Sequence, residues 1–264
     1  MKMRFQTLSF ATAALLTVCL TGCNKEDKDA ISMEDVNKGI QIVIGADGKE
    51  YQVVDLGLTS GNLWATCNLG ADSPEQSGDF YAWGETEPKT QFGWKTYKWS
   101  DDDGVLIYKY STSPDYGTPD QKITLDKDDE ATVALLGEDW RIPSKQDFNE
   151  LLTKKNCTVK YCRLNGVGGF LFTSVRRDFE GNSIFFPLAG MNDYDAVRYA
   201  GQYGWYWANT LYQELDQEKE KELLYTPLEA TILWLEHGEI DNHQIKNKAR
   251  RAGLPIRAIY VGRI

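Results

Sequence analysis

Residues with the chemistry for catalysis or metal binding are few in this chain. Its 264 residues include two histidines, His237 and His243, and five cysteines. The histidines are six positions apart beside Glu239 and Asp241, so the chain has no His-Glu-x-x-His zinc motif. No Gly-x-Ser-x-Gly nucleophile elbow accompanies them. We therefore predict no catalytic residue, no metal site and no cofactor, and we interpret the histidines as part of a solvated hairpin tip.

Three cysteines are candidates for redox chemistry in the body of the chain: Cys67, Cys157 and Cys162. In an oxidising compartment Cys157 and Cys162 can pair locally. Alternatively, Cys67 and Cys157 can close a loop of about 90 residues, which the chain-entropy model rates above about 4 kcal/mol. Burial as reduced thiols is the third alternative.

The N-terminal residues have the pattern of an export signal. Residues 1–4 include two basic residues, Lys2 and Arg4. The uncharged run that follows is about 16 residues long, which is too short to span a membrane. The sequence Leu-Thr-Gly-Cys that ends at Cys23 resembles the lipobox of bacterial lipoproteins, in which the cysteine receives a diacylglyceryl group. The resemblance implies a lipoprotein signal peptide over residues 1–22, lipidation of Cys23 and anchoring in the outer membrane. Residues 23–38 are predicted to be a flexible acidic tether.

Charge and aromatic content narrow the range of partners. The formal net charge is −10, which is opposite to what a nucleic-acid-binding surface needs. Trp205, Tyr206 and Trp207 are consecutive, and on a strand the two tryptophans share one face while the tyrosine takes the other. One set is expected in the core. The other, with Trp83 or Trp94, is a candidate platform for stacking a glycan or peptide ligand.

Turn and capping signals predict the elements that must position these residues. Asp47-Gly48 between two apolar runs predicts a hairpin. Ser144, with Asp147 three residues on, predicts a capped helix over about 145–154, and a helix over about 127–136 is predicted before it. Trp140, between the two helices, is expected to be buried. Strands follow, over about residues 169–175, 183–188, 204–209, 230–236 and 256–261.

Six segments occur in a characteristic order. They are residues 54–58 (VDLGL), 63–71 (LWATCNLGA), 78–86 (GDFYAWGET), 140–144 (WRIPS), 182–190 (NSIFFPLAG) and 206–210 (YWANT). This ordered set resembles the Fibrobacter succinogenes major paralogous domain family, which is common in exported lipoproteins of Bacteroides-like bacteria. The resemblance implies an α+β fold of the C-type-lectin-like kind, with two early helices and twisted antiparallel strands, as a single domain over residues 39–264.

The resemblance also bears on the cysteines and on sugar binding. Family members often carry cysteines at the positions of Cys67 and Cys157, which implies a disulfide between them. A lectin-like fold does not itself confer calcium-dependent sugar binding. The residues at 207–210 lack the final aspartate of the lectin calcium strand, and those at 87–89 lack the amide of the calcium loop.

Together these features predict a non-enzymatic lipoprotein of the outer membrane, at the cell surface, whose domain binds or adheres to an extracellular glycan or protein. A structural subunit of a surface fibre is the alternative, followed by a glycan-processing hydrolase. An exposed aromatic groove would favour the binding protein, and a sheet edge open to a donated strand would favour the fibre. A buried histidine–carboxylate pair in a cleft would favour the hydrolase.

Overall fold

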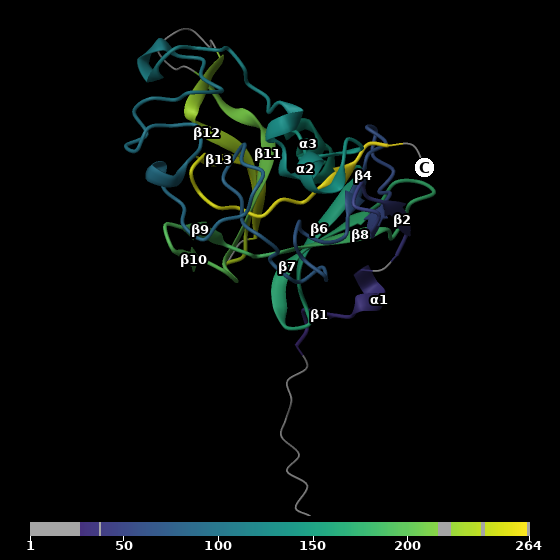
Figure 1. The fold of residues 1–264 in the computed structure, drawn as a ribbon. Helices are drawn as coiled ribbons and strands as arrows, with labels where there is room; N and C mark the ends of the chain where they lie inside the picture. The colour runs from purple at the N-terminus through teal and green to yellow at the C-terminus, as the bar shows by residue number, and fades with distance from the viewer. Residues whose placement is uncertain (1–26, 37, 216–222, 239–240, 263–264) are drawn as a thin grey trace, which may run out of the picture.

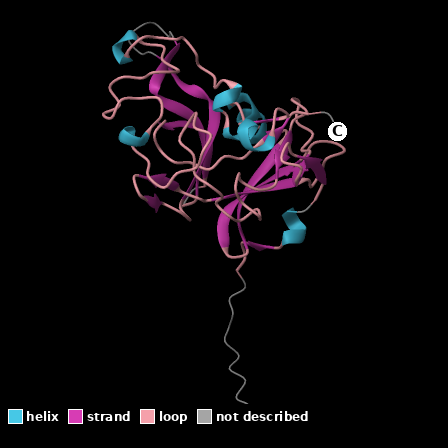
Figure 2. Cartoon of the chain, viewed as in Figure 1, coloured by secondary structure: helices cyan, strands magenta, loops and turns pink. Residues whose placement is uncertain are grey.

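A computed structural model describes residues 27–36, 38–215, 223–238 and 241–262 (Figure 1). Strands make up most of the regular structure, and the helices are short (Figure 2). The α+β class predicted from the sequence is therefore confirmed. The expected signal peptide and Cys23 lie outside the described residues.

The predicted hairpin belongs to a five-stranded sheet in the order β2-β3-β4-β14-β5. Its turn closes through a hydrogen bond of 2.9 Å from the Gly45 amide to the Lys49 carbonyl, and Gly48 takes a φ of 77° that favours glycine. Strand β14 brings the C-terminal region between two early segments of the chain. The strands are β2 (Ile40–Ile44), β3 (Glu50–Val54), β4 (Leu63–Ala65), β5 (Trp140–Arg141) and β14 (Ile259–Tyr260).

A second sheet has the order β1-β6-β7-β8 and includes residues that the sequence placed in the tether. Strand β1 pairs in parallel with β6, and Val36 of the short helix α1 is buried beside Phe185 of β8. The prediction of a flexible tether through residue 38 is therefore wrong for its second half, because these residues complete an apolar cluster. The elements are β1 (Ala30–Ile31), α1 (Met33–Val36), β6 (Cys157–Leu164), β7 (Val167–Ser174) and β8 (Ser183–Pro187).

The remaining strands form a three-stranded antiparallel sheet and a separate hairpin. The sheet has the order β11-β12-β13, and its strands are long and strongly paired. The hairpin precedes it in the chain and carries exposed side chains. The strands are β9 (Met191–Asp193), β10 (Ala196–Arg198), β11 (Tyr203–Leu215), β12 (Leu223–Glu236) and β13 (Asn242–Ala249).

Of the two predicted α-helices, the second forms where expected, and the first forms only over its second half. Helix α3 (Lys145–Leu152) has the predicted capping box, in which the Ser144 hydroxyl accepts from the Asp147 amide at 3.2 Å. Burial alone would raise the pKa of Asp147, but hydrogen bonds from Arg141 and Ser144 outweigh it and lower that pKa. The predicted helix over 127–136 is divided at the extended residue Glu130. Its parts are the 3₁₀ turn η3 (Lys127–Asp129) and α2 (Ala131–Leu136); the other 3₁₀ turns are η1 (Trp94–Thr96) and η2 (Pro114–Tyr116).

Strand β11 runs through the middle of the core. Trp205 and Trp207 lie in one large apolar cluster, and Tyr206 and Ala208 lie in a second cluster on the other side of the strand. Three buried hydrogen bonds fix these rings: Trp207 Nε1 donates to the Tyr81 carbonyl, Tyr206 Oη to the Pro187 carbonyl, and Trp83 Nε1 to the Ala208 carbonyl. Burial on both faces explains the continuous aromatic run in this strand.

Candidate functional site

The tryptophans predicted as a stacking platform are core residues. Trp83, Trp205 and Trp207 are each at most 2% exposed, and Tyr206 is fully buried. The prediction that one face of the 205–207 run meets a ligand is therefore wrong, because apolar clusters cover both faces of β11. Of the aromatic residues considered from the sequence for stacking, Trp94 is the one that reaches the surface.

The implied disulfide between Cys67 and Cys157 is absent, and Cys67, Cys157 and Cys162 are free thiols. Cys157 begins β6 inside the core, and burial raises the pKa of its thiol to about 12. Burial likewise raises the pKa of Cys162 to about 11. Cys67 instead lines a surface cavity on the other side of the first sheet. The disulfide prediction is therefore wrong: Cys67 and Cys157 lie in different environments, which matches the reduced-thiol alternative.

His237 lies in the turn between β12 and β13, at the predicted hairpin tip, and His243 lies in β13 itself. His237 stacks on Tyr161 with ring centroids 3.4 Å apart, and its Nδ1 lies 2.7 Å from Asp241 Oδ1. Both members of this pair are partly exposed, on a turn and not in a cleft. His243 is more buried, and burial lowers its pKa. The arrangement does not provide the buried histidine–carboxylate pair that would favour a hydrolase.

Metal-binding clusters and membrane-spanning helices are absent from the described ranges, residues 27–36, 38–215, 223–238 and 241–262. These ranges contain no group of three or more histidine, cysteine or carboxylate side chains placed to hold a metal ion. Likewise, none of the helices they contain is long and apolar enough to cross a membrane.

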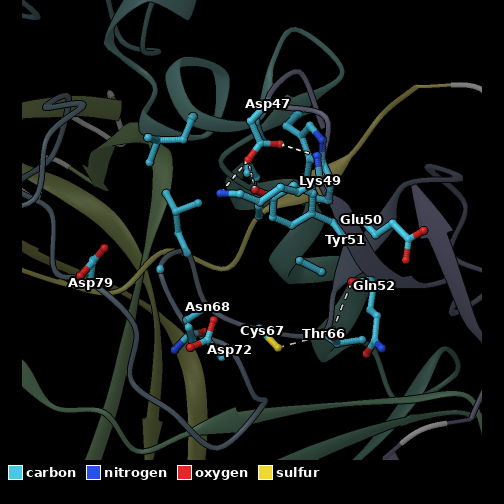
Figure 3. A pocket seen from close by; sticks show the side chains of 18 of the residues that line it. Asp47, Lys49, Glu50, Tyr51, Gln52, Thr66, Cys67, Asn68, Asp72 and Asp79 are labelled. Carbon is cyan, nitrogen blue, oxygen red and sulfur yellow. Dashed lines mark hydrogen bonds and ion pairs between the residues drawn. The ribbon is translucent and has the colours of Figure 1, made fainter. Parts of the chain in front are cut away.

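Two surface cavities stand out. The larger, about 550 Å³, opens beside the β2–β3 hairpin (Figure 3). The smaller, about 440 Å³, lies between the loop that contains η1 and the β9–β10 hairpin, and we name it the aromatic groove. Both fall in the size range of small-ligand sites. The aromatic groove is lined by Gln91, Phe92, Gly93, Trp94, Lys95, Thr96, Asp102, Asp103, Tyr194 and Asp195.

One wall of the aromatic groove is the half-buried ring of Trp94. A Cβ atom at Gly104 would stand only 2.4 Å from Trp94 Cδ2, so the absence of a side chain there lets the backbone lie against the ring. Gly104 also takes a φ of 72°, which other residues rarely adopt. Tyr97 packs edge-on with the same indole, with ring centroids 5.8 Å apart. The Trp94 ring is therefore held in one orientation before any ligand arrives.

A second aromatic residue of the lining is Tyr194, at the turn between β9 and β10. Its ring is 59% exposed, although its carbonyl accepts a hydrogen bond of 2.6 Å from the Phe92 amide. The Arg251 guanidinium lies 4.9 Å from the ring centroid and also pairs with Asp193 at 2.7 Å. Tyr194 has a φ of 60°, which is uncommon for a residue with a large side chain. Such backbone strain is often found at ligand-binding sites.

Three carboxylates also line the aromatic groove: Asp102, Asp103 and Asp195. All three are exposed, and none has an ion-pair or side-chain hydrogen-bond partner within the described part of the chain. An ionised carboxylate is purely an acceptor, so it can receive hydrogen bonds from ligand hydroxyls. An aromatic ring offers a flat apolar face to C–H groups. The groove can therefore bind a molecule that has both an apolar face and hydroxyl groups.

Buried Arg250 anchors the segment that carries this groove. It donates to Tyr97 Oη at 2.8 Å and to the carbonyls of Lys109, Tyr110 and Pro227 at 2.7–3.1 Å. These bonds tie the irregular chain after η1 to strand β12. Without Arg250, four acceptors from three segments of the chain would lose this donor.

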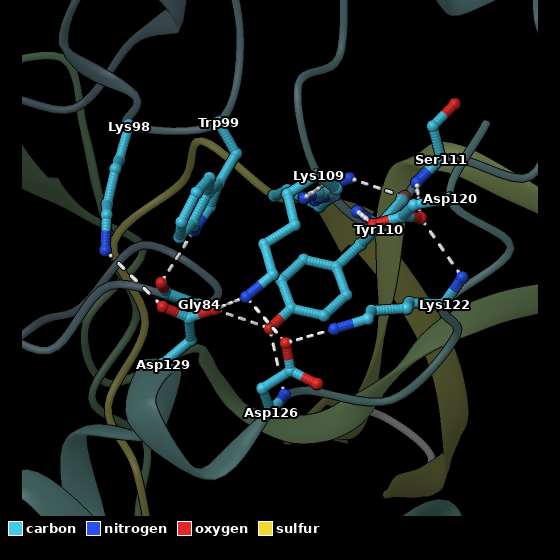
Figure 4. A network of polar contacts seen from close by, with 11 residues as sticks. Gly84, Lys98, Trp99, Lys109, Tyr110, Ser111, Asp120, Lys122, Asp126 and Asp129 are labelled. Atoms are coloured by element: carbon cyan, nitrogen blue, oxygen red, sulfur yellow. Dashed lines mark hydrogen bonds and ion pairs between the residues drawn. The ribbon is translucent and has the colours of Figure 1, made fainter. Parts of the chain in front are cut away.

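A second polar network holds the same segment from the other side (Figure 4). Lys109 Nζ lies 2.6 Å from Asp126 and 2.5 Å from the buried Asp129, which also accepts from Tyr110 Oη at 2.6 Å. Burial alone would lower the pKa of Lys109, but the hydrogen bonds that it donates to both carboxylates raise it. Bonds from Lys109 and Lys122 lower the pKa of Asp126. The aromatic groove therefore stands on a rigid base although its own residues lie in loops.

Comparison of the chain with protein-family models, with curated proteins and with solved structures found no match in any of the three. Among the features of this chain, the aromatic groove bears most directly on its function.

Proposed function

We propose that this protein is a non-enzymatic, extracellular carbohydrate-binding protein, and that the aromatic groove is its binding site. The observation that carries the proposal is that two aromatic rings, Trp94 and Tyr194, line one groove together with three unpaired carboxylates. Sugar rings have apolar C–H faces and equatorial hydroxyls, which match an aromatic wall and carboxylate acceptors.

The proposal includes the setting of the domain. Lipidation at Cys23 would anchor the chain in the outer membrane, with a single domain that includes β1 and α1 at the cell surface. We also propose a C-type-lectin-like fold of the Fibrobacter succinogenes major paralogous kind. Its support is that the characteristic segments supply buried core tryptophans, namely Trp64, Trp83, Trp140 and Trp207.

Replacing Tyr194 with asparagine should weaken carbohydrate binding at least tenfold, which corresponds to about 1.4 kcal/mol. Asparagine tolerates the left-handed backbone at this position, so the variant loses the ring without added strain. The measurement is a glycan-array screen of the full chain, followed by calorimetric titration of the glycans retained.

Tyr108→Asn is the matched control, because Tyr108 is 61% exposed and lies outside the groove. It should bind as the wild type does. Equal weakening by both substitutions, or a wild-type chain that retains no glycan, would contradict the proposal.

One observation favours a second candidate function, that of a subunit in a surface fibre. Strand β2 is at the edge of its sheet, and Ile42 and Ile44 are 48% and 60% exposed. In an antiparallel pair, every second residue of a strand is hydrogen-bonded to the neighbouring strand. Gly45 is bonded to Lys49, so Val43 and Gln41 are the residues of β2 that are bonded to β3. The amides and carbonyls of Ile42 and Ile44 therefore point outward, where a strand from a second copy of this chain can add.

If β2 receives such a strand, the full chain should associate as its concentration rises, and Ile42→Lys should shift it towards the monomer. A charged side chain on an edge strand opposes strand addition. Sedimentation velocity measures the effect. Val197→Lys, on β10, is the control because Val197 is 50% exposed but distant from β2 in the topology. If the wild-type chain stays monomeric at every concentration, this second proposed function is contradicted.

A further inference from the structure

The larger cavity, which we name the acidic pocket, is separate from the aromatic groove and shares no lining residue with it. It is bounded by the β2–β3 hairpin, by the loop that follows β4 and by the end of α2. Figure 3 shows Asp72 and Asp79 on one side of the cavity and Asp47 and Tyr51 on the other.

The mouth of the acidic pocket carries uncompensated negative charge. Asp47 is satisfied, because Lys49 pairs with it at 3.1 Å and Tyr51 Oη donates to it at 2.9 Å. The carboxylates of Glu50, Asp72 and Asp79 have no ion-pair or hydrogen-bond partner within the ranges described. All three side chains are exposed, but Glu50 points away from the cavity, whereas Asp72 and Asp79 lie on the loop after β4, where a cation meets two free acceptors (Figure 3).

Two buried residues that line the pocket carry polar atoms without partners. Tyr81 and Trp140 line the cavity and are each about 1% exposed. Neither Tyr81 Oη nor Trp140 Nε1 has a hydrogen-bond partner among the described residues. Burial, then the charges of Asp79 and Glu87, raise the pKa of Tyr81, which keeps its hydroxyl protonated. Buried donors of this kind are rarely left unpaired in a folded protein.

We propose that the acidic pocket binds a small primary amine that also carries hydroxyl or carbonyl oxygens, such as an amino sugar. The ammonium group pairs with Asp72 and Asp79 on the loop after β4, and ligand oxygens accept from Trp140 Nε1 and Tyr81 Oη. This site does not depend on the aromatic groove, so it extends the proposed function and does not rest on it.

The test is calorimetric titration of the full chain with D-glucosamine and, as the uncharged counterpart, D-glucose. Glucosamine should bind more tightly than glucose by at least fivefold. Asp79→Asn should remove that preference, because it deletes one carboxylate without changing the shape of the side chain. Tyr81→Phe should weaken glucosamine binding while leaving the fold intact, since the lost hydroxyl has no partner in the protein.

Cys67 provides an independent readout, because it lines this pocket and is less buried than Cys157 and Cys162. Glucosamine should slow alkylation of Cys67 by iodoacetamide, measured by peptide mass spectrometry, and glucose should not. The groove variant Tyr194→Asn should still prefer glucosamine over glucose, and glucosamine should still protect its Cys67. That result separates this site from the proposed glycan site. Equal binding of the two sugars, or an unchanged preference in Asp79→Asn, would overturn the proposal.

Discussion

Replacing Arg257 with methionine is expected to lower the free energy of unfolding by about 4 kcal/mol or more, as is typical when a buried hydrogen-bond network is broken. Arg257 is fully buried and donates to Asn68 Oδ1 at 2.9 Å, to the carbonyls of Ala65 and Thr66 at 3.1 and 2.5 Å, and to the Phe185 carbonyl at 2.9 Å. These bonds join the loop after β4 to strand β8, so one side chain links two sheets.

The size of the effect follows from what remains after the substitution. Methionine fills a similar length but donates no hydrogen bond, so four buried acceptors lose their partner, each at a cost of about 1–3 kcal/mol. Relaxation of the loop would recover part of that cost. Urea denaturation followed by circular dichroism measures the change.

Arg198→Met is the matched control, because Arg198 is an exposed residue of β10. It should change stability by less than about 0.5 kcal/mol. A loss below about 1.5 kcal/mol for Arg257→Met would contradict the account, since it would mean that the acceptors find other donors once the guanidinium is gone.

Replacing Trp140 with alanine should lower the free energy of unfolding by about 3–5 kcal/mol, the usual cost of a large core truncation. The indole is buried between Tyr51 and Tyr260, with ring centroids 5.7 and 5.3 Å away. It therefore joins the first hairpin to the C-terminal strand β14. Guanidinium denaturation of the full chain measures the loss.

Trp140→Phe should cost much less, because phenylalanine keeps an aromatic ring and the indole N–H has no partner to lose among the described residues. The comparison therefore separates ring packing from hydrogen bonding. A loss below about 1 kcal/mol in Trp140→Ala would contradict the burial seen here.

Local signals in the sequence were sufficient for several elements. Asp47-Gly48 specifies a turn whatever surrounds it, and Ser144 with Asp147 caps α3 through bonds made within one helical turn. Burial of Trp140 was also predicted correctly from its position between two helices. These features depend on neighbours in the sequence, which makes them accessible without a structure.

Features set by distant contacts were not predicted. Strand β13 has polar residues at most positions and was missed, because its pairing with β12 and not its own apolar pattern holds it in place. The stacking role expected for Trp205 and Trp207 failed because β11 is covered on both faces. Order in β1 and α1 likewise depends on contacts with β6 and β8.

The candidate site was predicted only in small part. Trp94 was considered from the sequence as a stacking residue, but Tyr194 was not, and about 100 residues separate them. No local motif links the two. The isolated pairing of Phe92 with Tyr194 brings their loops together, and that contact is visible only in the folded chain.

The central claim is that a carbohydrate binds between Trp94 and Tyr194, and one measurement tests it most directly. The indole N–H resonances of the eight tryptophans can be followed by nuclear magnetic resonance while a glycan retained on the array is titrated into the full chain. The account predicts a saturable shift of the Trp94 resonance, with those of Trp83, Trp205 and Trp207 nearly unchanged because these rings are buried. A glycan that binds without moving the Trp94 resonance would contradict it.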